Sequence, residues 1–446
     1  MSPSSAGGLN DTPVGLVEVL RDREFRGMYF AHLASIVGDQ IAKVALAILV
    51  YDRTSSAALS ALVYALTLLP WLAAPWLSIL GDRYPRRDVL IGCDLARAAV
   101  VGLMVVPAIP LAVLLALLAA VSLLAPPFEA ARSALLADLL TGPRYVAATT
   151  LTQLSGQGGQ VLGFAVGGVV VSTLTVRGAL ALDCATFVLS AALLVLVVAR
   201  HPTTAPRLAT ASPTSDAPSP AADPSPAADP SLGPTRAAAR ARWSDGLTYV
   251  LGDPALRSLV LLAWIIVFFT IAPEGLAVAV ASTHGRAHLD AGLLTAAIPL
   301  GVFVGTLAIG RLLPLKGQLS VMLPLALVGT GTLALTAFIP GVGGLVVLWA
   351  FAGSGLAFNL PANAAFVRAT KNDMRSRAFG VAQAGLQLAQ AAGLLVAGFA
   401  ADHLAPRTVV TVAGIAGAFA VIGLWATWPR TNVVQALNIG QNSDIS

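Results

Sequence analysis

Four polar residues follow one face of the first apolar segment of the chain, residues 26–51. His32, Ser35, Asp39 and Lys43 are three or four residues apart, which places them on one narrow stripe of a helix. If the segment crosses a membrane, ionisable groups there cost about 2.5–3.5 kcal/mol each, so the stripe is expected to face a bundle interior or a water-filled cavity. Because Lys43 stands one turn after Asp39, mutual neutralisation is the alternative interpretation.

Two further acid–base pairs have i, i+3 spacing in later apolar segments. They are Asp94 with Arg97, and Glu129 with Arg132. A self-satisfied ion pair on one helix explains either pair. The alternative is a site that binds and releases a proton, because burial favours a neutral carboxyl group while a movable cation favours the carboxylate. These four residues and Asp39 are therefore candidates for proton coupling.

Glu274 is a further candidate for proton coupling. It follows Pro273 in the seventh apolar segment, and no basic residue stands one turn away. Proline often kinks a membrane helix and frees backbone groups there, so a carboxyl group without a partner at this point is a candidate for gating or for binding a proton. Alternatively, its short distance in sequence from His284 places it near the water at the membrane surface.

A pattern of glutamines and glycines occurs twice, 230 residues apart. The two sets are Gln153, Gln157, Gln160, Gly163 and Gly168, then Gln383, Gln387, Gln390, Gly393 and Gly398. The repeat predicts a duplicated chain with equivalent helices in its two halves. Amides donate and accept hydrogen bonds without charge, so the glutamines are predicted either to line a substrate path or to join helices. His32, Lys43 and Asn359 complete the predicted path.

The composition indicates a membrane protein. Hydrophobic residues make up 57% of the 446 and charged residues only 11%, whereas soluble domains carry roughly 25% charged residues. Twelve segments approach the length of about 20 apolar residues that a membrane helix needs. They lie at 26–51, 57–80, 88–107, 110–136, 148–174, 178–199, 255–281, 289–312, 319–339, 342–362, 379–402 and 407–428. The predicted fold is an all-α membrane protein of twelve transmembrane helices in two pseudo-symmetric six-helix bundles.

Between the predicted halves, residues 201–242 hold nine prolines and a tandem Ser-Pro-Ala-Ala-Asp-Pro. Such a segment buries too little apolar area to become ordered, so a flexible tether is expected. Trp243 to Leu256 has the pattern of an amphipathic helix on the membrane surface. The predicted division is a cytoplasmic tail at 1–24, a first bundle at 25–200, the tether at 201–242, the surface helix and second bundle at 243–430, and a cytoplasmic tail at 431–446.

The distribution of basic residues predicts the orientation. Of the 27 lysines and arginines, 19 lie in the even-numbered loops and the two tails, and four lie in the odd-numbered loops. Basic loops stay in the cytoplasm, so both termini and the tether are expected there, in a multi-pass protein of the cell inner membrane. The same rule explains the net charge of +5, and nucleic-acid binding is not expected.

Catalytic and cofactor motifs are absent from the sequence. No Gly-Lys pair occurs, which excludes a phosphate-binding Gly-x-x-x-x-Gly-Lys loop. There is no His-Glu-x-x-His, Gly-x-Ser-x-Gly or Cys-x-x-Cys, and Cys93 and Cys184 form no metal-binding pattern. An enzyme, a metal site and a cofactor are therefore not expected.

The loop after the second segment carries a family resemblance. Leu80 to Arg87 reads Leu-Gly-Asp-Arg-Tyr-Pro-Arg-Arg and resembles the signature loop of the major facilitator superfamily, Gly-x-Leu-Ala-Asp-Arg-x-Gly-Arg-Arg, with Ser78 and Pro85 where that family has glycine. The resemblance implies the major facilitator fold and a charge-relay latch that steadies the outward-facing state. The residues it implies for the latch are Asp82, Arg83, Arg86 and Arg87, with Asp138 as a partner.

Three other stretches are similar to the efflux branch of that superfamily, which contains macrolide-efflux and enterobactin-exporter-like proteins. They are Asp94 to Arg97, Pro127 to Leu135, and Gly163 to Gly168, where Phe164 replaces the proline of the antiporter motif Gly-Pro-x-x-Gly-Gly. The resemblance implies a monomer that exports drugs, siderophores or secondary metabolites in exchange for protons by alternating access. The alternative is a lipid or lysophospholipid transporter, or a membrane receptor on the same scaffold.

Overall fold

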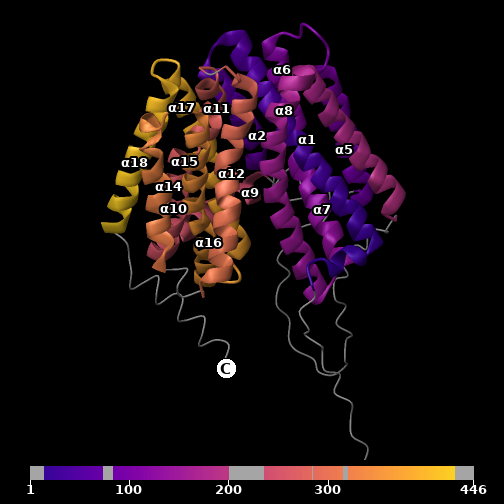
Figure 1. The fold of residues 1–446 in the computed structure, drawn as a ribbon. Helices are drawn as coiled ribbons and strands as arrows, with labels where there is room; N and C mark the ends of the chain where they lie inside the picture. Colours follow the sequence, from indigo (N-terminus) through magenta and orange to yellow (C-terminus); the bar gives the residue numbers. More distant parts are fainter. Residues whose placement is uncertain (1–14, 74–83, 200–235, 284, 315–319, 427–446) are drawn as a thin grey trace, which may run out of the picture.

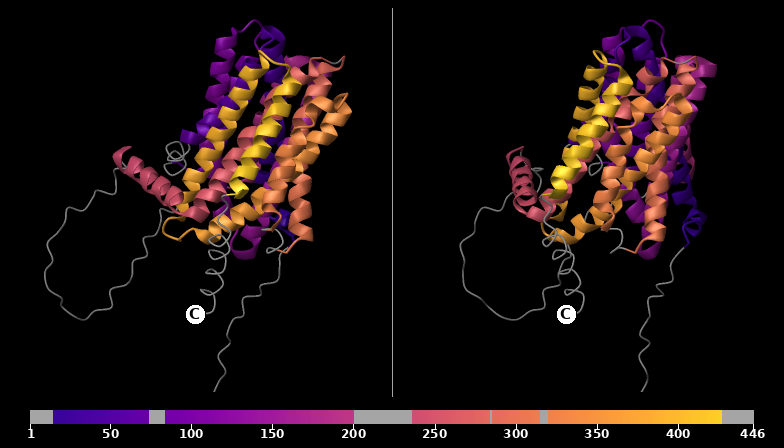
Figure 2. Two further views of the ribbon diagram at one scale, coloured as in Figure 1. Left: turned by 90° about the vertical axis from the view of Figure 1, so that its left-hand side faces the viewer. Right: turned by 60° about the vertical axis from the view of Figure 1, so that its left-hand side comes forward.

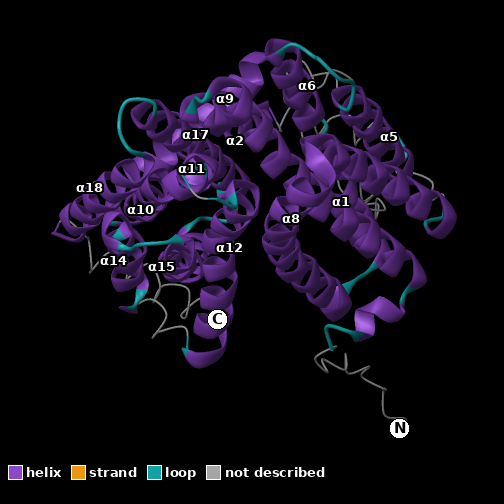
Figure 3. Ribbon diagram, turned by 45° about the horizontal axis from the view of Figure 1, so that its top comes forward, coloured by secondary structure: helices purple, strands orange, loops and turns teal. Residues whose placement is uncertain are grey.

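The computed structural model describes residues 15–73, 84–199, 236–283, 285–314 and 320–426. These ranges consist of helices and short connections and contain no strand (Figure 3). The first half contains η1 (Glu18–Arg21), α1 (Arg23–Thr54), α2 (Ala57–Leu68), η2 (Leu69–Ala73), α5 (Arg86–Met104), α6 (Leu111–Leu123), α7 (Ala125–Leu139) and α8 (Gly142–Val197). The second contains α9 (Arg236–Gly252), α10 (Pro254–Thr270), α11 (Ala272–Ala281), α12 (Ala287–Leu312), α14 (Met322–Leu333), η3 (Thr336–Phe338), α15 (Val342–Gly355), η4 (Leu356–Phe358), α16 (Asn359–Ala369), α17 (Arg375–Ala401) and α18 (Pro406–Ala426).

These helices provide the twelve expected spans. Within the described ranges, eight helical stretches are long and apolar enough to cross a membrane. One of them, α8, holds two spans, because Thr175 leaves helical geometry with φ 71° and ψ 168°. The apolar stretches Ala57–Ala73 and Met322–Phe338 are shorter, and α5 carries buried charges. With these three, the described chain forms an all-α membrane fold of twelve spans in two six-helix bundles.

Among the interrupted spans of the described chain, three break beside a polar residue singled out in the sequence. The fourth span breaks between α6 and α7 at Leu124, shortly before Glu129. The seventh breaks between α10 and α11, whose first turn contains Glu274. The tenth passes through η4 into α16, which begins at Asn359. Irregular backbone at membrane depth is tolerated where it is buried in protein or lines a water-filled cavity.

The two halves meet mainly at one end of the molecule. Their ribbons approach near the top of Figure 1 and diverge toward the bottom. Contacts between halves pair α8 with α12, and α2 with α11 and α17. We call the end that contains Asp52, Ser56, His288 and Asp402 the closed end. There His288 Nε2 lies 3.5 Å from Asp52 Oδ2, and Ser56 Oγ donates to Asp402 at 2.8 Å.

Helix packing inside each half follows the 230-residue repeat. A methyl group added to Gly163 would lie 2.8 Å from the carbonyl oxygen of Val37 on α1. Gly393, its counterpart, packs just as closely on Phe268, at the equivalent level of α10. Each glycine thus lets the fifth helix of its half approach the first helix at backbone distance. The duplication predicted from the polar pattern is therefore present in the packing.

The helix that precedes the second bundle differs in its limits from the expected Trp243–Leu256. It is α9, which begins at Arg236 and ends at Gly252, because Pro254 starts α10 and Asp253 caps it. α9 extends obliquely from the bundle (Figure 2). Its C-terminal half contacts α17 and the turn before it, where Gly246 packs on Arg377 and Tyr249 Oη accepts from the amide of Lys371 at 3.1 Å.

Candidate functional site

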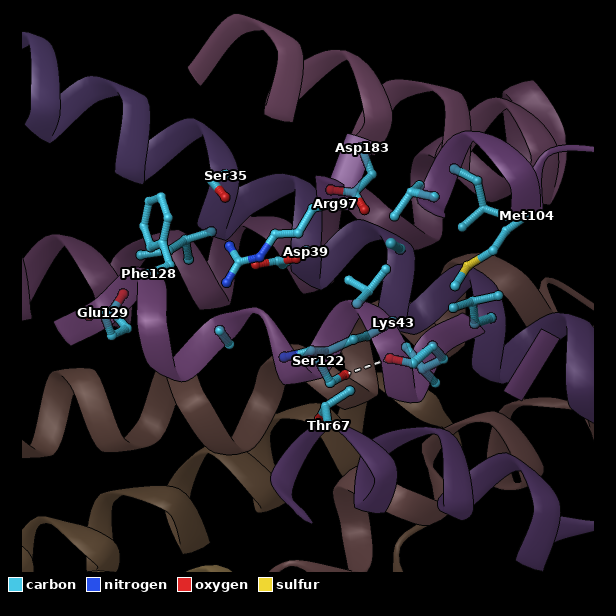
Figure 4. Close-up of a pocket in the computed structure, with 18 of the residues that line it drawn as sticks. Ser35, Asp39, Lys43, Thr67, Arg97, Met104, Ser122, Phe128, Glu129 and Asp183 are labelled. Atoms are coloured by element: carbon cyan, nitrogen blue, oxygen red, sulfur yellow. Dashed lines mark hydrogen bonds between the residues drawn. The ribbon is translucent and has the colours of Figure 1, made fainter. Parts of the chain in front are cut away.

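A cavity of about 180 Å³ lies inside the first half. Its walls come from α1, α2, η2, α5, α6, α7 and α8, and Figure 4 shows its polar side chains converging from several of these helices. Six of its lining residues have ionisable side chains, namely His32, Asp39, Lys43, Arg97, Glu129 and Asp183. Uncharged hydroxyls from Ser35, Thr67 and Ser122 lie among them. The cavity therefore concentrates charge within a bundle of apolar helices.

The stripe on α1 faces this cavity along its whole length. His32, Ser35, Asp39 and Lys43 all line it. In the described part of the chain, neither Asp39 nor Lys43 forms an ion pair within 4.0 Å, so the interpretation as a simple neutralising pair was wrong. Asp39 instead lies within electrostatic range of Arg97 as well as Lys43, and Figure 4 shows the Arg97 guanidinium beside it.

Arg97 and Asp94 do not pair with each other, contrary to one reading of their spacing. Asp94 is fully buried and accepts a hydrogen bond from Ser190 Oγ on α8 at 2.5 Å, while its second carboxylate oxygen has no hydrogen-bond partner among the described residues. The Arg97 guanidinium carbon lies 4.8 Å from the ring centre of Phe128 and 5.6 Å from that of Phe187. Two aromatic faces thus hold the cation, and the same side chain lines the cavity.

Glu129 and Arg132 do form the predicted ion pair. Arg132 Nη2 donates to Glu129 Oε2 at 2.6 Å, and its Nε donates to the same oxygen at 3.1 Å. His32 Nδ1 lies 3.8 Å from the other carboxylate oxygen of Glu129, and the His32 ring stacks on Phe128 with centroids 6.2 Å apart. A carboxylate with a cation on one side and a titratable imidazole on the other has a charge balance that changes with protonation of His32.

Glu274 lies on the second half but faces the first. It is half-buried in the first turn of α11, a helix that contacts α1 and α2. It lies within electrostatic range of Lys43 and Tyr64. The Tyr64 hydroxyl is buried without a hydrogen-bond partner in the described residues. The carboxyl group therefore has polar neighbours across the boundary between the halves.

The predicted substrate-path amides fall into different environments. Gln383 and Asn359 line a second cavity, which lies in the second half. Gln387 is buried and accepts from Gln390 Nε2 at 3.3 Å. In the first half, Gln153 and Gln157 are exposed and Gln160 is half-buried. The repeat is thus exact in spacing but not in surroundings.

Only part of the predicted latch can be placed. Asp82 and Arg83 lie outside the described residues. Arg86 forms an ion pair with Asp138 and also donates to the carbonyl of Ala134 at 2.8 Å. Arg87 donates to the carbonyl of Val195 at 2.7 Å. These bonds join the start of α5 to the ends of α7 and α8, all within the first half.

Sequence reasoning gave too little weight to Asp183. It lines the cavity, is buried, and lies against Gly38, where an added methyl group would be 2.6 Å from its carboxylate oxygen. Asp39, which follows Gly38 in the sequence, lies within electrostatic range of Asp183. The sequence signal that could have identified it is that Asp183 is the acidic residue of the sixth span, which is otherwise largely apolar. No such signal pointed to Ser190 or Phe187, which lie on the same helix.

The sequence matches the family model of the Major Facilitator Superfamily over residues 28–339 and again over 275–443. The chain belongs to the major facilitator superfamily. As a member of that superfamily it is a multi-pass membrane transporter rather than an enzyme. No curated protein matches the sequence.

Solved structures of the superfamily share the fold. A mutant of the peptide transporter POT in complex with alafosfalin gives a TM-score of 0.69 at 13% identity, covering 93% of this chain and 96% of that one. A POT family transporter in complex with 5-aminolevulinic acid gives 0.66 at 12%, covering 92% and 96%. A bacterial homologue of the human lysosomal transporter Spinster, inward-facing and occupied, gives 0.62 at 14%, covering 95% and 97%. At such identities the likeness concerns the fold alone.

Proposed function

We propose that this superfamily member is a proton-coupled exporter of amphipathic small molecules that works by alternating access. It acts as a monomer in the cell inner membrane with both termini in the cytoplasm. Its substrates are drugs, siderophores or secondary metabolites, as the motifs similar to the efflux branch suggest. The observation that carries the proposal is the charge balance around the first cavity.

Acidic groups outnumber basic ones there. The cavity is lined by three carboxyl groups, those of Asp39, Glu129 and Asp183, and by two basic side chains, those of Lys43 and Arg97. Just outside the lining, Asp94 adds one carboxyl group and Arg132, which is paired with Glu129, adds one basic group. Uncompensated charge is costly within a bilayer, so one bound proton makes the cluster neutral. Release of that proton leaves a net negative charge. The free-energy cost of this charge is lower when the cavity is open to water than when it is closed.

Asp39 is the first choice for the proton-binding carboxyl group. It lines the cavity without an ion-pair partner in the described chain, whereas Glu129 is held by Arg132. Asp183 lines the same cavity and lies within electrostatic range of Asp39, so we propose that one proton serves both carboxyl groups. Glu129, through Arg132 and His32, is the second choice.

The contacts between halves support alternating access. The closed end is remote from the start of α1 and from the end of α18. With the cytoplasmic orientation expected from the basic loops, this arrangement is the inward-facing state. In that state substrate enters from the cytoplasm. Rocking of the two bundles then breaks the closed end and exposes the same cavities to the outside.

Proton movement in proteoliposomes tests the proposal. The purified protein is reconstituted around a trapped pH dye, and macrolides, tetracyclines, cationic dyes and siderophores are added to wild type, Asp39→Asn and Glu129→Gln. Asp245→Asn serves as a control, because Asp245 is a surface acid paired with Arg377 at 3.7 Å. Compound-dependent proton flux that is lost in Asp39→Asn but kept in Asp245→Asn supports antiport.

Two results would point elsewhere. Transport of a labelled compound without proton flux would exclude proton coupling. Silence with every compound, combined with movement of labelled lysophospholipid between leaflets, would favour the lipid-transport alternative.

A further inference from the structure

The cavity of the second half has chemistry unlike that of the first. It lies between α10, α16 and α17 and has a volume of about 350 Å³, within the range of roughly 300–1,000 Å³ that is usual for small-molecule pockets. Its lining contains no ionisable residue. Three aromatic residues and three amides provide most of its chemistry, namely Trp264, Phe366, Phe379, Asn359, Asn363 and Gln383.

Aromatic side chains form fixed walls of this cavity. Phe366 and Phe379 pack edge to face with ring centres 5.2 Å apart. Trp264 Nε1 donates to the carbonyl of Ala382 at 3.0 Å. The absence of a side chain at Gly385 lets the indole lie directly against α17. The rings are therefore held by their neighbours before any ligand arrives.

Three amides supply hydrogen-bonding capacity without charge. Asn359, Asn363 and Gln383 line the cavity and are exposed. Asn359 Nδ2 donates to the carbonyl of Leu356 at 3.1 Å, which leaves its carbonyl oxygen available. Polar side chains in transmembrane helices avoid lipid and face the bundle interior or a water-filled cavity. The exposed amides therefore face the space that substrate enters.

We infer that this cavity binds the uncharged ring portion of the transported molecule, a planar group that carries both hydrogen-bond donors and acceptors. This inference rests on the proposed function and assigns the substrate class to it. A charged group would lose its hydration here without meeting a counter-charge, whereas a flat ring stacks on the aromatic walls. Any charged portion of the same substrate lies toward the charged cavity of the first half.

Equilibrium binding of defined probes tests this site. The full-length protein in lipid nanodiscs, without a pH gradient, is titrated with radiolabelled chloramphenicol, which is an uncharged ring amphipath, with the planar cation ethidium, and with lysophosphatidylglycerol. The decisive variant is Gln383→Glu, which keeps the side-chain size and adds one negative charge. Its control is Asn372→Glu, because Asn372 is an exposed polar residue in the turn between α16 and α17 and lines neither cavity.

We expect wild type to prefer chloramphenicol. Gln383→Glu should weaken chloramphenicol binding about tenfold and strengthen ethidium binding, while Asn372→Glu changes both by less than about twofold. Trp264→Phe, which keeps a ring but removes part of the wall, should weaken chloramphenicol to a smaller extent. Tighter binding of ethidium or of the lysolipid by wild type, absence of chloramphenicol binding, or equal effects of the two glutamate variants would overturn the inference.

The binding experiment and the proton-flux experiment test the two proposals separately. Chloramphenicol that binds in this pattern but moves no protons would contradict the proposed coupling and leave the site intact. Proton flux with another compound, together with insensitivity of binding to Gln383→Glu, would contradict the site and leave the coupling intact.

Discussion

Gly168 and Gly398, 230 residues apart, form the same contact on opposite sides of the boundary between the halves. A methyl group added at Gly168 would lie 2.8 Å from the carbonyl oxygen of His288 on α12, and one added at Gly398 would lie 2.8 Å from Cα of Ala58 on α2. Ala58 and His288 are themselves 230 residues apart. The closed end is therefore built from two copies of one helix crossing, each of which has a glycine at its tightest point.

Enlarging either glycine should open this end. Gly168→Val or Gly398→Val introduces side-chain atoms where the partner backbone lies, at a cost of about 1–3 kcal/mol, which shifts the conformational equilibrium about tenfold. Spin labels at Thr150 and Ser376, in a background without Cys93 and Cys184, should report shorter distances between the halves at the end nearer the termini. Gly158→Val, where an added methyl group meets nothing within 4 Å, is the control.

Asp402 should contribute to the same closure by capping a helix of the other half. Its carboxylate accepts from the backbone amides of Ala57 at 2.6 Å and Ala58 at 3.3 Å. Asp402→Ala removes a helix cap worth about 1 kcal/mol, so we expect the closed-end population to fall about fivefold in the same spin-label measurement. Ser172 occupies the equivalent position of the first half but bonds within its own helix to Val169. A shift as large in Ser172→Ala would contradict the capping role.

Ser190→Ala should destabilise the first bundle. Asp94 has no other hydrogen bond within the described residues, and its carboxyl group would then be buried without a partner, at a cost of about 1–3 kcal/mol. The midpoint of thermal unfolding in detergent should therefore fall. Ser122→Ala is a matched control, because Ser122 is also buried but bonds to Leu118 one turn earlier on its own helix. Equal midpoints for the two variants would argue against a structural role for the Asp94 bond.

The Glu129–Arg132 pair can be tested for coupling as distinct from structure. Glu129→Gln leaves Arg132 uncompensated, so both thermal stability and compound-dependent proton flux should fall. In Glu129→Gln with Arg132→Gln the charge imbalance is removed, and stability should largely return while proton flux stays low. Recovery of flux in the double variant would show that the pair is only structural.

The sequence predicted the elements better than their side-chain partners. Hydropathy located the spans because the cost of burying polar backbone and charge in lipid acts on each segment separately. The repeat was readable because the glycines that permit close crossings occur at the same spacing in both halves, as at Gly163 and Gly393. The limits of α9 were missed, since Arg236 lies inside a segment whose composition suggested a tether.

Partners that lie far apart in the sequence could not be predicted. Asp94 and Arg97 looked like a pair because i, i+3 spacing was the visible relationship, yet Asp94 bonds to Ser190, 96 residues later. Arg97 is held by the rings of Phe128 and Phe187. In the sequence alone, these two residues look like ordinary core phenylalanines. The stripe on α1 was easier, because a single helix fixes the directions of His32 and Asp39 by itself.

The first turn of α2 is completed only while the halves touch, since Asp402 of the other half supplies the acceptor for its free amides. When the closed end separates, those two amide hydrogens lose their acceptor and meet water. Their exchange with deuterium should therefore be slow in one state and fast in the other. Deuterium uptake in peptides that contain Ala57 and Ala58 would thus report, without a spin label, the fraction of time for which the closed end is separated.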